Sequence, residues 1–351
     1  MIPSRVGRRR LLLVLILLGL SACGPDGESE PQSWTRLPAV LNAVSSLAFD
    51  SGGTPVIVGG DRTFGDYHVQ RPRASDGLWE HAVGLPKASF GDYLFRAGDT
   101  MYAVIDRVLF YRLDDESSFT WSWIEMPDVP NLNRLAGLAA DESVVYGVAS
   151  VELEPGVFRD VLVAWSPGDT EWTVVPGSET EGSIFATAVS PQGRVVMSSQ
   201  QGIFSGDASG VSLLVDCQAP EYSYCQQPVT HMVVDAEDVT YLVCGYTGGV
   251  RAMFRVPITG GTAVRVGDVP DDRAYCKRLQ LLPDRSVILT SAFDNLTDVD
   301  AALFRLAPGG NGLSRILDEV DADFTYVVRD GSTVFRYGDG HFASGVERRG
   351  L

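Results

Sequence analysis

The sequence predicts an all-β fold made of seven similar units, each containing four antiparallel strands. Short turn-forming clusters recur along the chain at intervals of 43 to 50 residues. Apolar runs of strand length flank each cluster, and a second turn rich in Gly, Pro or Asp follows in most units. A repeat of this length is typical of folds that stack one supersecondary unit many times. The seven clusters begin at Asp50, Ala97, Ala140, Ser190, Asp235, Pro283 and Arg329.

The first two strands of each unit are predicted to form a β-hairpin around the cluster. In the first unit the runs 46–49 and 55–58 enclose the turn, and in the last unit the runs 324–328 and 333–335 do so. Apolar, β-branched and aromatic residues on both sides of a short Asp/Gly turn are typical of a hairpin.

A continuous apolar run marks the third strand of most units. Such a run indicates a strand that is covered on both faces, as happens where sheets stack face to face. These runs are 108–111, 161–165, 252–254 and 301–304. A turn and a short fourth strand follow, and Trp79, Trp123 and Trp172 open or lie within such strands.

Seven four-stranded units of this length resemble a seven-bladed β-propeller, and the resemblance covers residues 34–351. The last unit begins near Phe324 and has room for only three strands, so we expect an N-terminal strand near Trp34 to complete it. Closing a ring in this way removes exposed sheet edges. The alternatives are two β-sandwiches, which need a linker in mid-chain, or a β-helix, which repeats at about half this period.

Residues 1–22 are predicted to be an export signal, because a basic start and an apolar run, 11–20, precede small residues. As a helix this run rises only about 15 Å, too little to cross a bilayer. Leu20-Ser21-Ala22-Cys23 resembles the lipobox of bacterial lipoproteins. The resemblance implies cleavage before Cys23 and lipidation of its sulfur, while an ordinary secretory signal is the alternative.

The predicted mature chain therefore starts with the lipidated Cys23 and a flexible tether, 23–33, followed by the propeller domain, 34–351. Multiple acyl chains give stable attachment to a membrane. In lipoproteins of this kind, an aspartate directly after the lipidated cysteine implies retention at the inner membrane. This chain has Gly24 at that position, so the resemblance implies an outer-membrane lipoprotein.

The charge balance argues against nucleic acid as a partner. The chain has 45 acidic and 28 basic residues, a net charge of −17, and the predicted signal removes four arginines and no acid. Such a protein repels phosphate backbones and gains nothing from counterion release.

Four cysteines remain after Cys23: Cys217, Cys225, Cys244 and Cys276. An even number in an exported chain predicts disulfides, and three connectivities are open. We favour Cys217 with Cys225 and Cys244 with Cys276. A four-cysteine zinc site is the alternative, although the spacings lack a C-x2-C pair.

The sequence contains no motif that identifies a reaction. The four histidines, His68, His81, His231 and His341, are interpreted as scattered over four different units, although a Ser-His-Asp triad could assemble across blades. Asp294, Asp298 and Asp300 could contribute ligands to a calcium site, and solvated acidic loops are the alternative.

These observations predict a lipid-anchored protein of the cell envelope whose propeller binds an unidentified envelope protein, glycan or small ligand. The alternative is a propeller-fold hydrolase or lyase with its site at the mouth of the channel. Such an enzyme could depend on calcium. A channel with convergent histidines and carboxylates would favour the enzyme, and an apolar channel would favour the binding module.

Overall fold

The computed structural model describes residues 33–37, 41, 43–60, 67–85, 91–97, 99–105, 108–113, 118–128, 131–139, 143–180, 182–219, 229–244, 251–269, 274–293, 300–321, 324–339 and 344–351. The chain divides into two compact units, Met1–Trp34 and Thr35–Leu351. The second unit contains every strand, and each regular element among the described residues is a strand. None of these residues belongs to a helix that could span a membrane.

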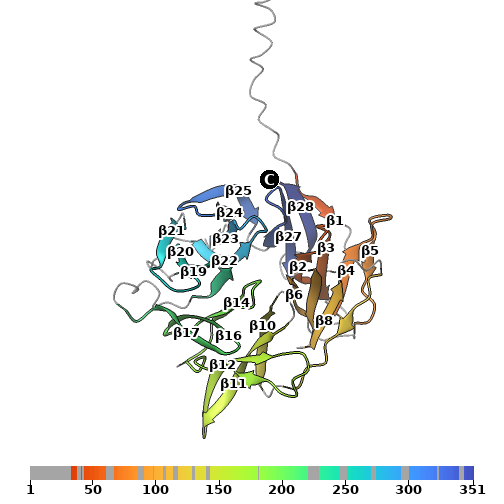
Figure 1. Ribbon diagram of the computed structural model, residues 1–351. Helices are drawn as coiled ribbons and strands as arrows, with labels where there is room; N and C mark the ends of the chain where they lie inside the picture. Colours follow the sequence, from red (N-terminus) through yellow and green to blue (C-terminus); the bar gives the residue numbers. More distant parts are fainter. Residues whose placement is uncertain are drawn as a thin grey trace, which may run out of the picture. The chain divides into compact units, whose positions relative to one another are not determined.

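Seven four-stranded antiparallel sheets form a ring, which confirms the predicted seven-bladed β-propeller (Figure 1). The first three blades are, in chain order, β2 (Ala43–Phe49), β3 (Pro55–Gly60), β4 (Tyr67–Pro72) and β5 (Trp79–His81); β6 (Gly91–Ala97), β7 (Thr100–Ile105), β8 (Val108–Leu113) and β9 (Ser122–Trp123); and β10 (Leu132–Leu138), β11 (Val145–Glu154), β12 (Val157–Trp165) and β13 (Thr173–Val174).

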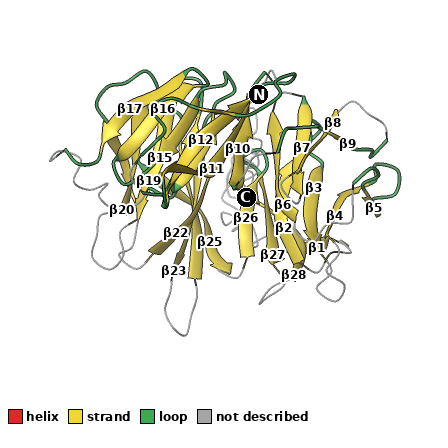
Figure 2. Ribbon diagram, turned by 90° about the horizontal axis from the view of Figure 1, so that it is seen from below, coloured by secondary structure: helices red, strands yellow, loops and turns green. Residues whose placement is uncertain are grey.

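The next three blades are β14 (Ala186–Val189), β15 (Val195–Ser198), β16 (Gly202–Asp207) and β17 (Gly210–Asp216); β18 (His231–Val234), β19 (Asp238–Cys244), β20 (Arg251–Pro257) and β21 (Val264–Asp268); and β22 (Ala274–Leu281), β23 (Val287–Phe293), β24 (Asp300–Leu306) and β25 (Leu313–Asp321). The first strand of each blade is innermost, and innermost strands contact one another in the pairs β2 with β6, β10 with β14, β14 with β18 and β18 with β22. The strands of the ring run side by side, with loops at both ends (Figure 2).

The seventh blade is closed by the N-terminal strand, as predicted. Its sheet has the order β1-β28-β27-β26, with β26 (Phe324–Val328), β27 (Thr333–Asp339) and β28 (Ser344–Gly350) from the end of the chain and β1 (Thr35–Leu37) from the beginning. β1 pairs antiparallel with β28, Thr35 opposite Arg348 and Leu37 opposite Val346. The closing blade also packs on the first blade, where the rings of Phe49 and Phe335 lie 5.0 Å apart.

Every predicted turn cluster joins the first and second strands of a blade. In several blades a side-chain oxygen at the start of the turn satisfies a backbone N–H within it. Asp50 Oδ1 accepts from the N–H of Thr54 at 2.7 Å, and Ser190 Oγ accepts from the N–H of Arg194 at 3.1 Å. This local bonding explains why Asp and Ser recur at these positions, since such side chains favour turns.

The core lies between the blades. Between the third and fourth blades, Val148 and Leu162 pack with Val195 and Met197, and all four are buried. The third strand of the third blade is buried throughout Val161–Trp165. The double-sided apolar runs are therefore the strands that stack face to face, as expected.

Candidate functional site

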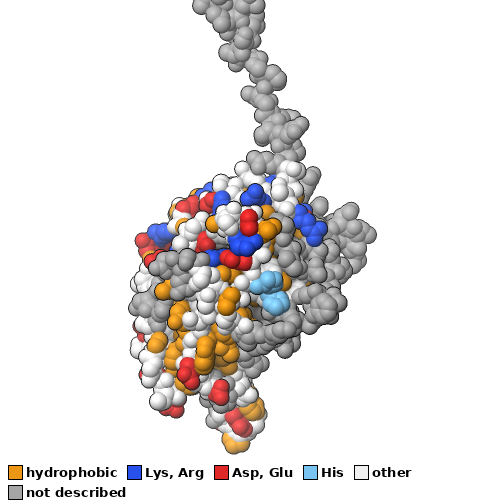
Figure 3. All heavy atoms as spheres, turned by 90° about the vertical axis from the view of Figure 1, so that its right-hand side faces the viewer, with side chains coloured by type: hydrophobic (Ala, Val, Ile, Leu, Met, Phe, Trp, Pro, Cys, Tyr) orange, Lys and Arg blue, Asp and Glu red, His pale blue; other side chains and the backbone are white. Residues whose placement is uncertain are grey.

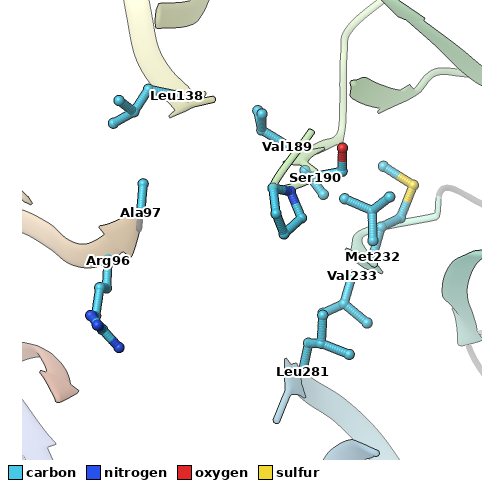
Figure 4. Close-up of a pocket in the computed structure, with 11 residues that line it drawn as sticks. Arg96, Ala97, Leu138, Val189, Ser190, Met232, Val233 and Leu281 are labelled. Atoms are coloured by element: carbon cyan, nitrogen blue, oxygen red, sulfur yellow. The ribbon is translucent and has the colours of Figure 1, made fainter. Parts of the chain in front are cut away.

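The described part of the central channel contains two cavities of about 320 and 300 Å³, named here the upper and the lower chamber. The lower chamber lies at the end where the first hairpin of each blade turns. The upper chamber is lined by Arg134, Leu135, Ala136, Ala186, Thr187, Thr230, His231, Met232 and Leu279. The lower chamber is lined by Arg96, Ala97, Leu138, Ala188, Val189, Ser190, Pro191, Met232, Val233, Val234 and Leu281 (Figure 4).

The two chambers follow one another along the same innermost strands. On β14, Thr187 lines the upper chamber and Val189 the lower one; on β18, His231 lines the upper chamber and Val233 the lower one. Met232 lines both. A ligand that enters the channel can therefore meet both linings in succession.

Arg134 is the cation of the upper chamber. Its side chain is half-buried, and Nη2 donates to the backbone carbonyl of Ile184 at 3.0 Å. Burial lowers the pKa of Arg134, an effect opposed by the charges of Asp160 and Tyr93. The guanidinium remains charged at physiological pH, because its ordinary pKa is far above neutrality.

Asp160 lies near Arg134 but is occupied by other donors. Its Oδ1 accepts from Asn133 Nδ2 at 3.0 Å and from Ser150 Oγ at 2.7 Å, and its Oδ2 accepts from the N–H of Ile184 at 3.3 Å. None of the ion pairs between described residues joins Asp160 to Arg134. The backbone of Ile184 thus lies between the two side chains: its carbonyl accepts from Arg134 and its N–H donates to Asp160.

Two polar side chains, one buried and one half-buried, hold neighbouring blades together beside the chambers. Ser198 is completely buried; its hydroxyl accepts from the N–H of Ala186 at 3.1 Å and donates to the carbonyl of Val229 at 2.6 Å. Gln280 makes two bonds to Val328 of the next blade, donating to its carbonyl at 2.7 Å and accepting from its N–H at 2.9 Å. The first contact supports the upper chamber and the second lies next to Leu281 of the lower chamber.

The lower chamber is mainly apolar. Leu138, Val189, Val233 and Leu281 surround the space in Figure 4, with Arg96 at its edge. A lining of this kind favours the burial of an apolar group, which gains free energy roughly in proportion to the area removed from water.

Most of the site residues predicted from the sequence lie outside the described part of the chain. Asp294 and Asp298 do so, as does the side chain of Asp300 at the start of β24, and the calcium site stays a prediction. Within the described part, no group of three His, Cys, Asp or Glu side chains could hold a metal ion. Cys23 also lies outside it, and its lipidation stays a prediction.

Of the four other cysteines, only Cys217 has a described side chain, which is buried and disulfide-bonded. Cys225 and the side chains of Cys244 and Cys276 lie outside the described residues. Both favoured pairings therefore stay predictions.

The interpretation that the four histidines belong to four different units is wrong for His68 and His81. Both lie in the first blade, on β4 and β5, because the short strand after Trp79 completes that blade. Their rings are 5.1 Å apart and nearly perpendicular, and Nε2 of the buried Gln70 lies 3.1 Å from Nε2 of His81. Burial, followed by the charge of His68, lowers the pKa of His81. Histidine forms a patch on the face shown in Figure 3.

Apart from His231, which was noted as one of four histidines, sequence reasoning missed the residues of the upper chamber, although one signal was present. Arg134 interrupts the apolar positions Leu132, Leu135 and Leu138 of a first strand. A charged residue in a strand that borders a channel is a candidate for ligand binding, whereas Thr187 and Thr230 carry no such signal.

No family model and no curated protein matches the sequence. Solved structures that resemble it include an oligogalacturonate lyase from Vibrio parahaemolyticus, with a TM-score of 0.62, 11% identity and coverage of 92% of this chain and 95% of that one. A catalytically inactive virginiamycin B lyase from Staphylococcus aureus with quinupristin has a TM-score of 0.58, 9% identity and coverage of 91% and 99%. YCF48 bound to D1 peptide has a TM-score of 0.56, 14% identity and coverage of 92% and 98%.

At these identities the likeness shows a shared fold. The neighbours include a peptide-bound protein and two lyases, so the fold is compatible with both binding and catalysis. The class of the protein is that of the seven-bladed β-propellers.

Proposed function

We propose that the protein is a lipid-anchored module of the outer membrane whose propeller binds a peptide or a small ligand in its central channel. The main support is that five successive blades, the second to the sixth, supply side chains to two consecutive chambers. Channels of this volume, with an apolar wall and a few convergent polar groups, are typical of ligand sites. The lipobox supports the anchor, and the peptide bound to YCF48 is a precedent for a ligand on this fold.

A tryptophan that fills the lower chamber tests this proposal. Val233→Trp places a bulky ring in the chamber, whereas Val264→Trp adds the same ring to the exposed outer strand β21 of the same blade. Native mass spectrometry of the Cys23→Ser protein, after incubation with envelope extract, would detect a retained ligand. We expect Val233→Trp to reduce retention at least tenfold and Val264→Trp to leave it unchanged. Equal retention by both variants would show that the channel is not the binding site.

The anchor is tested separately. In the producing cell, Cys23→Ser is expected to move the protein from the membrane fraction to the soluble fraction, because the sulfur that would carry the lipid is gone. Continued membrane association of the variant would contradict the lipoprotein assignment.

The alternative, a propeller-fold hydrolase or lyase, is favoured by one observation. His231 lines the same chamber as Arg134, and histidine is the side chain that enzymes use most often as a general acid or base. If the ligand leaves the protein chemically changed, and His231→Gln abolishes the change while binding persists, the channel is an active site.

A further inference from the structure

We infer that the upper chamber binds a carboxylate and that the lower chamber receives an apolar group attached to it. The ligand is then a carboxylic acid with an apolar chain, a description that fits both a peptide C-terminus and a fatty acid. This inference rests on the proposed function, because it assumes that the channel is the binding site.

The donors of Arg134 are largely unused by the described residues. A guanidinium has five N–H groups. Within the described protein, one of the five donates a hydrogen bond, to the carbonyl of Ile184. A half-buried cation without a paired anion is unfavourable, and a bidentate carboxylate is the partner that fits its planar fork.

The neighbouring carboxylate does not fill this role. Asp160 accepts three hydrogen bonds from Asn133, Ser150 and Ile184 and makes no ion pair with Arg134. By accepting from the N–H of Ile184, it instead helps to hold the backbone whose carbonyl accepts from Arg134. Arg134 is thus oriented by the protein but not neutralised by a direct contact.

The other polar groups of the upper chamber can also donate to an anion. Thr187 and Thr230 bring hydroxyl groups from β14 and from the residue before β18. None of the described residues that line either chamber carries a carboxylate. In a chain with a net charge of −17, this cationic lining inside an acidic protein favours an anion in the channel.

The lower chamber determines the remainder of the ligand. Its wall is mainly apolar, and Met232 is common to both chambers, so an apolar chain can extend from the carboxylate without leaving the channel. Each methylene buried there is expected to tighten binding about fourfold.

The test compares acids with neutral analogues of the same shape. Isothermal titration calorimetry of the Cys23→Ser protein would measure decanoate against decanol, and N-acetyl-Leu-Leu-Val against its C-terminal amide. We expect at least one acid to bind about tenfold or more tightly than its neutral partner, as one charge-assisted bidentate contact predicts. The pair that shows the preference distinguishes a fatty acid from a peptide C-terminus.

Substitutions then test whether Arg134 is responsible for the preference for the acid over its neutral analogue. Arg134→Gln should remove the preference for the acid, and Arg134→Lys should retain part of it, because lysine keeps the charge but not the fork. Arg265→Gln, on the exposed outer strand β21, is the matched control and should keep the whole preference. Circular dichroism would confirm that each variant folds. If Arg134→Gln does not fold, the inference is tested with Arg134→Lys alone. An undiminished preference for the acid in Arg134→Lys would then contradict the inference.

Two results would overturn the inference. One is equal binding of acid and neutral analogue by the unsubstituted protein, and the other is a preference that survives Arg134→Gln. The outcome also separates the two proposals: if neither acid binds, but Val233→Trp still blocks retention of an envelope ligand, the channel is a binding site for a different class of ligand.

Discussion

The upper and lower chambers are lined by consecutive residues of the same strands, yet one is polar and the other is mainly apolar. At the lower end each innermost strand runs directly into its hairpin turn, whose backbone groups bond within the turn, as Gly193 N–H does to Ser190 O at 3.0 Å. At the upper end the chain arrives from the preceding blade, and side chains such as Ser198 and Arg134 bond to that connecting backbone.

The two ends of the channel thus differ in how their backbone groups are satisfied. At the hairpin end the turns bond within themselves, as at Ser190, and Gln280 also reaches Val328 of the next blade; at the opposite end both Ser198 and Arg134 bond to connecting backbone. Arg134 also lines the upper chamber, where it can meet a ligand. Substitutions at one end at a time test this difference.

The largest effect on stability is expected at the upper end. Ser198→Ala would leave the N–H of Ala186 and the carbonyl of Val229 without their buried partner, at a cost of about 2 kcal/mol in the free energy of unfolding. Urea unfolding followed by tryptophan fluorescence would measure this, with exposed Ser212→Ala as the control. If both variants unfold at the same midpoint, the bond does not support the upper chamber.

A smaller effect is expected at the lower end. Gln280→Leu removes both bonds to Val328, but Gln280 is only half-buried and water can replace part of what is lost. We expect a loss of about 1 kcal/mol. The same urea titration measures it, with Gln192→Leu in an exposed turn as the control. If Gln280→Leu lowers the free energy of unfolding more than Ser198→Ala does, the expectation that the upper end contributes more to stability is wrong.

The smallest effect is expected outside the channel, at the His68–His81 pair. Because the pKa of His81 is lowered in the folded protein, the unfolded chain binds more protons below about pH 6.5, and stability should fall slightly as the pH falls from there to the folded pKa. Thermal unfolding of the protein and of His81→Gln between pH 7.5 and 5 would show this. An identical pH dependence in the variant would exclude the pair as its source.

The fold was predictable because its signals are local. The turns at Asp50 and Ser190 are formed by bonds between residues four positions apart, and the Asp235 side chain accepts from the N–H groups of Glu237 and Asp238 in its own turn. The closing strand was predictable from arithmetic, because the last unit lacks a strand and the segment at Thr35–Leu37 supplies one.

The pairing of His68 with His81 was not predicted, although a signal existed. β4 and β5 are antiparallel neighbours with Gln70 opposite His81, so a strand register would have placed both histidines on one face. Dividing the sequence at its turns gives the order of the strands but not their register.

The number of blades and the strand order within them could be predicted from the sequence, because hairpin turns and strand-length apolar runs are properties of neighbouring residues, and the closure of the ring followed from counting strands. The set of side chains that meet in the channel could be found only in the three-dimensional structure. Arg134, Thr187 and His231 come from three different blades, and no spacing along the chain relates them. They converge because the ring brings each innermost strand to the same axis, which is a property of the closed fold and not of any one unit.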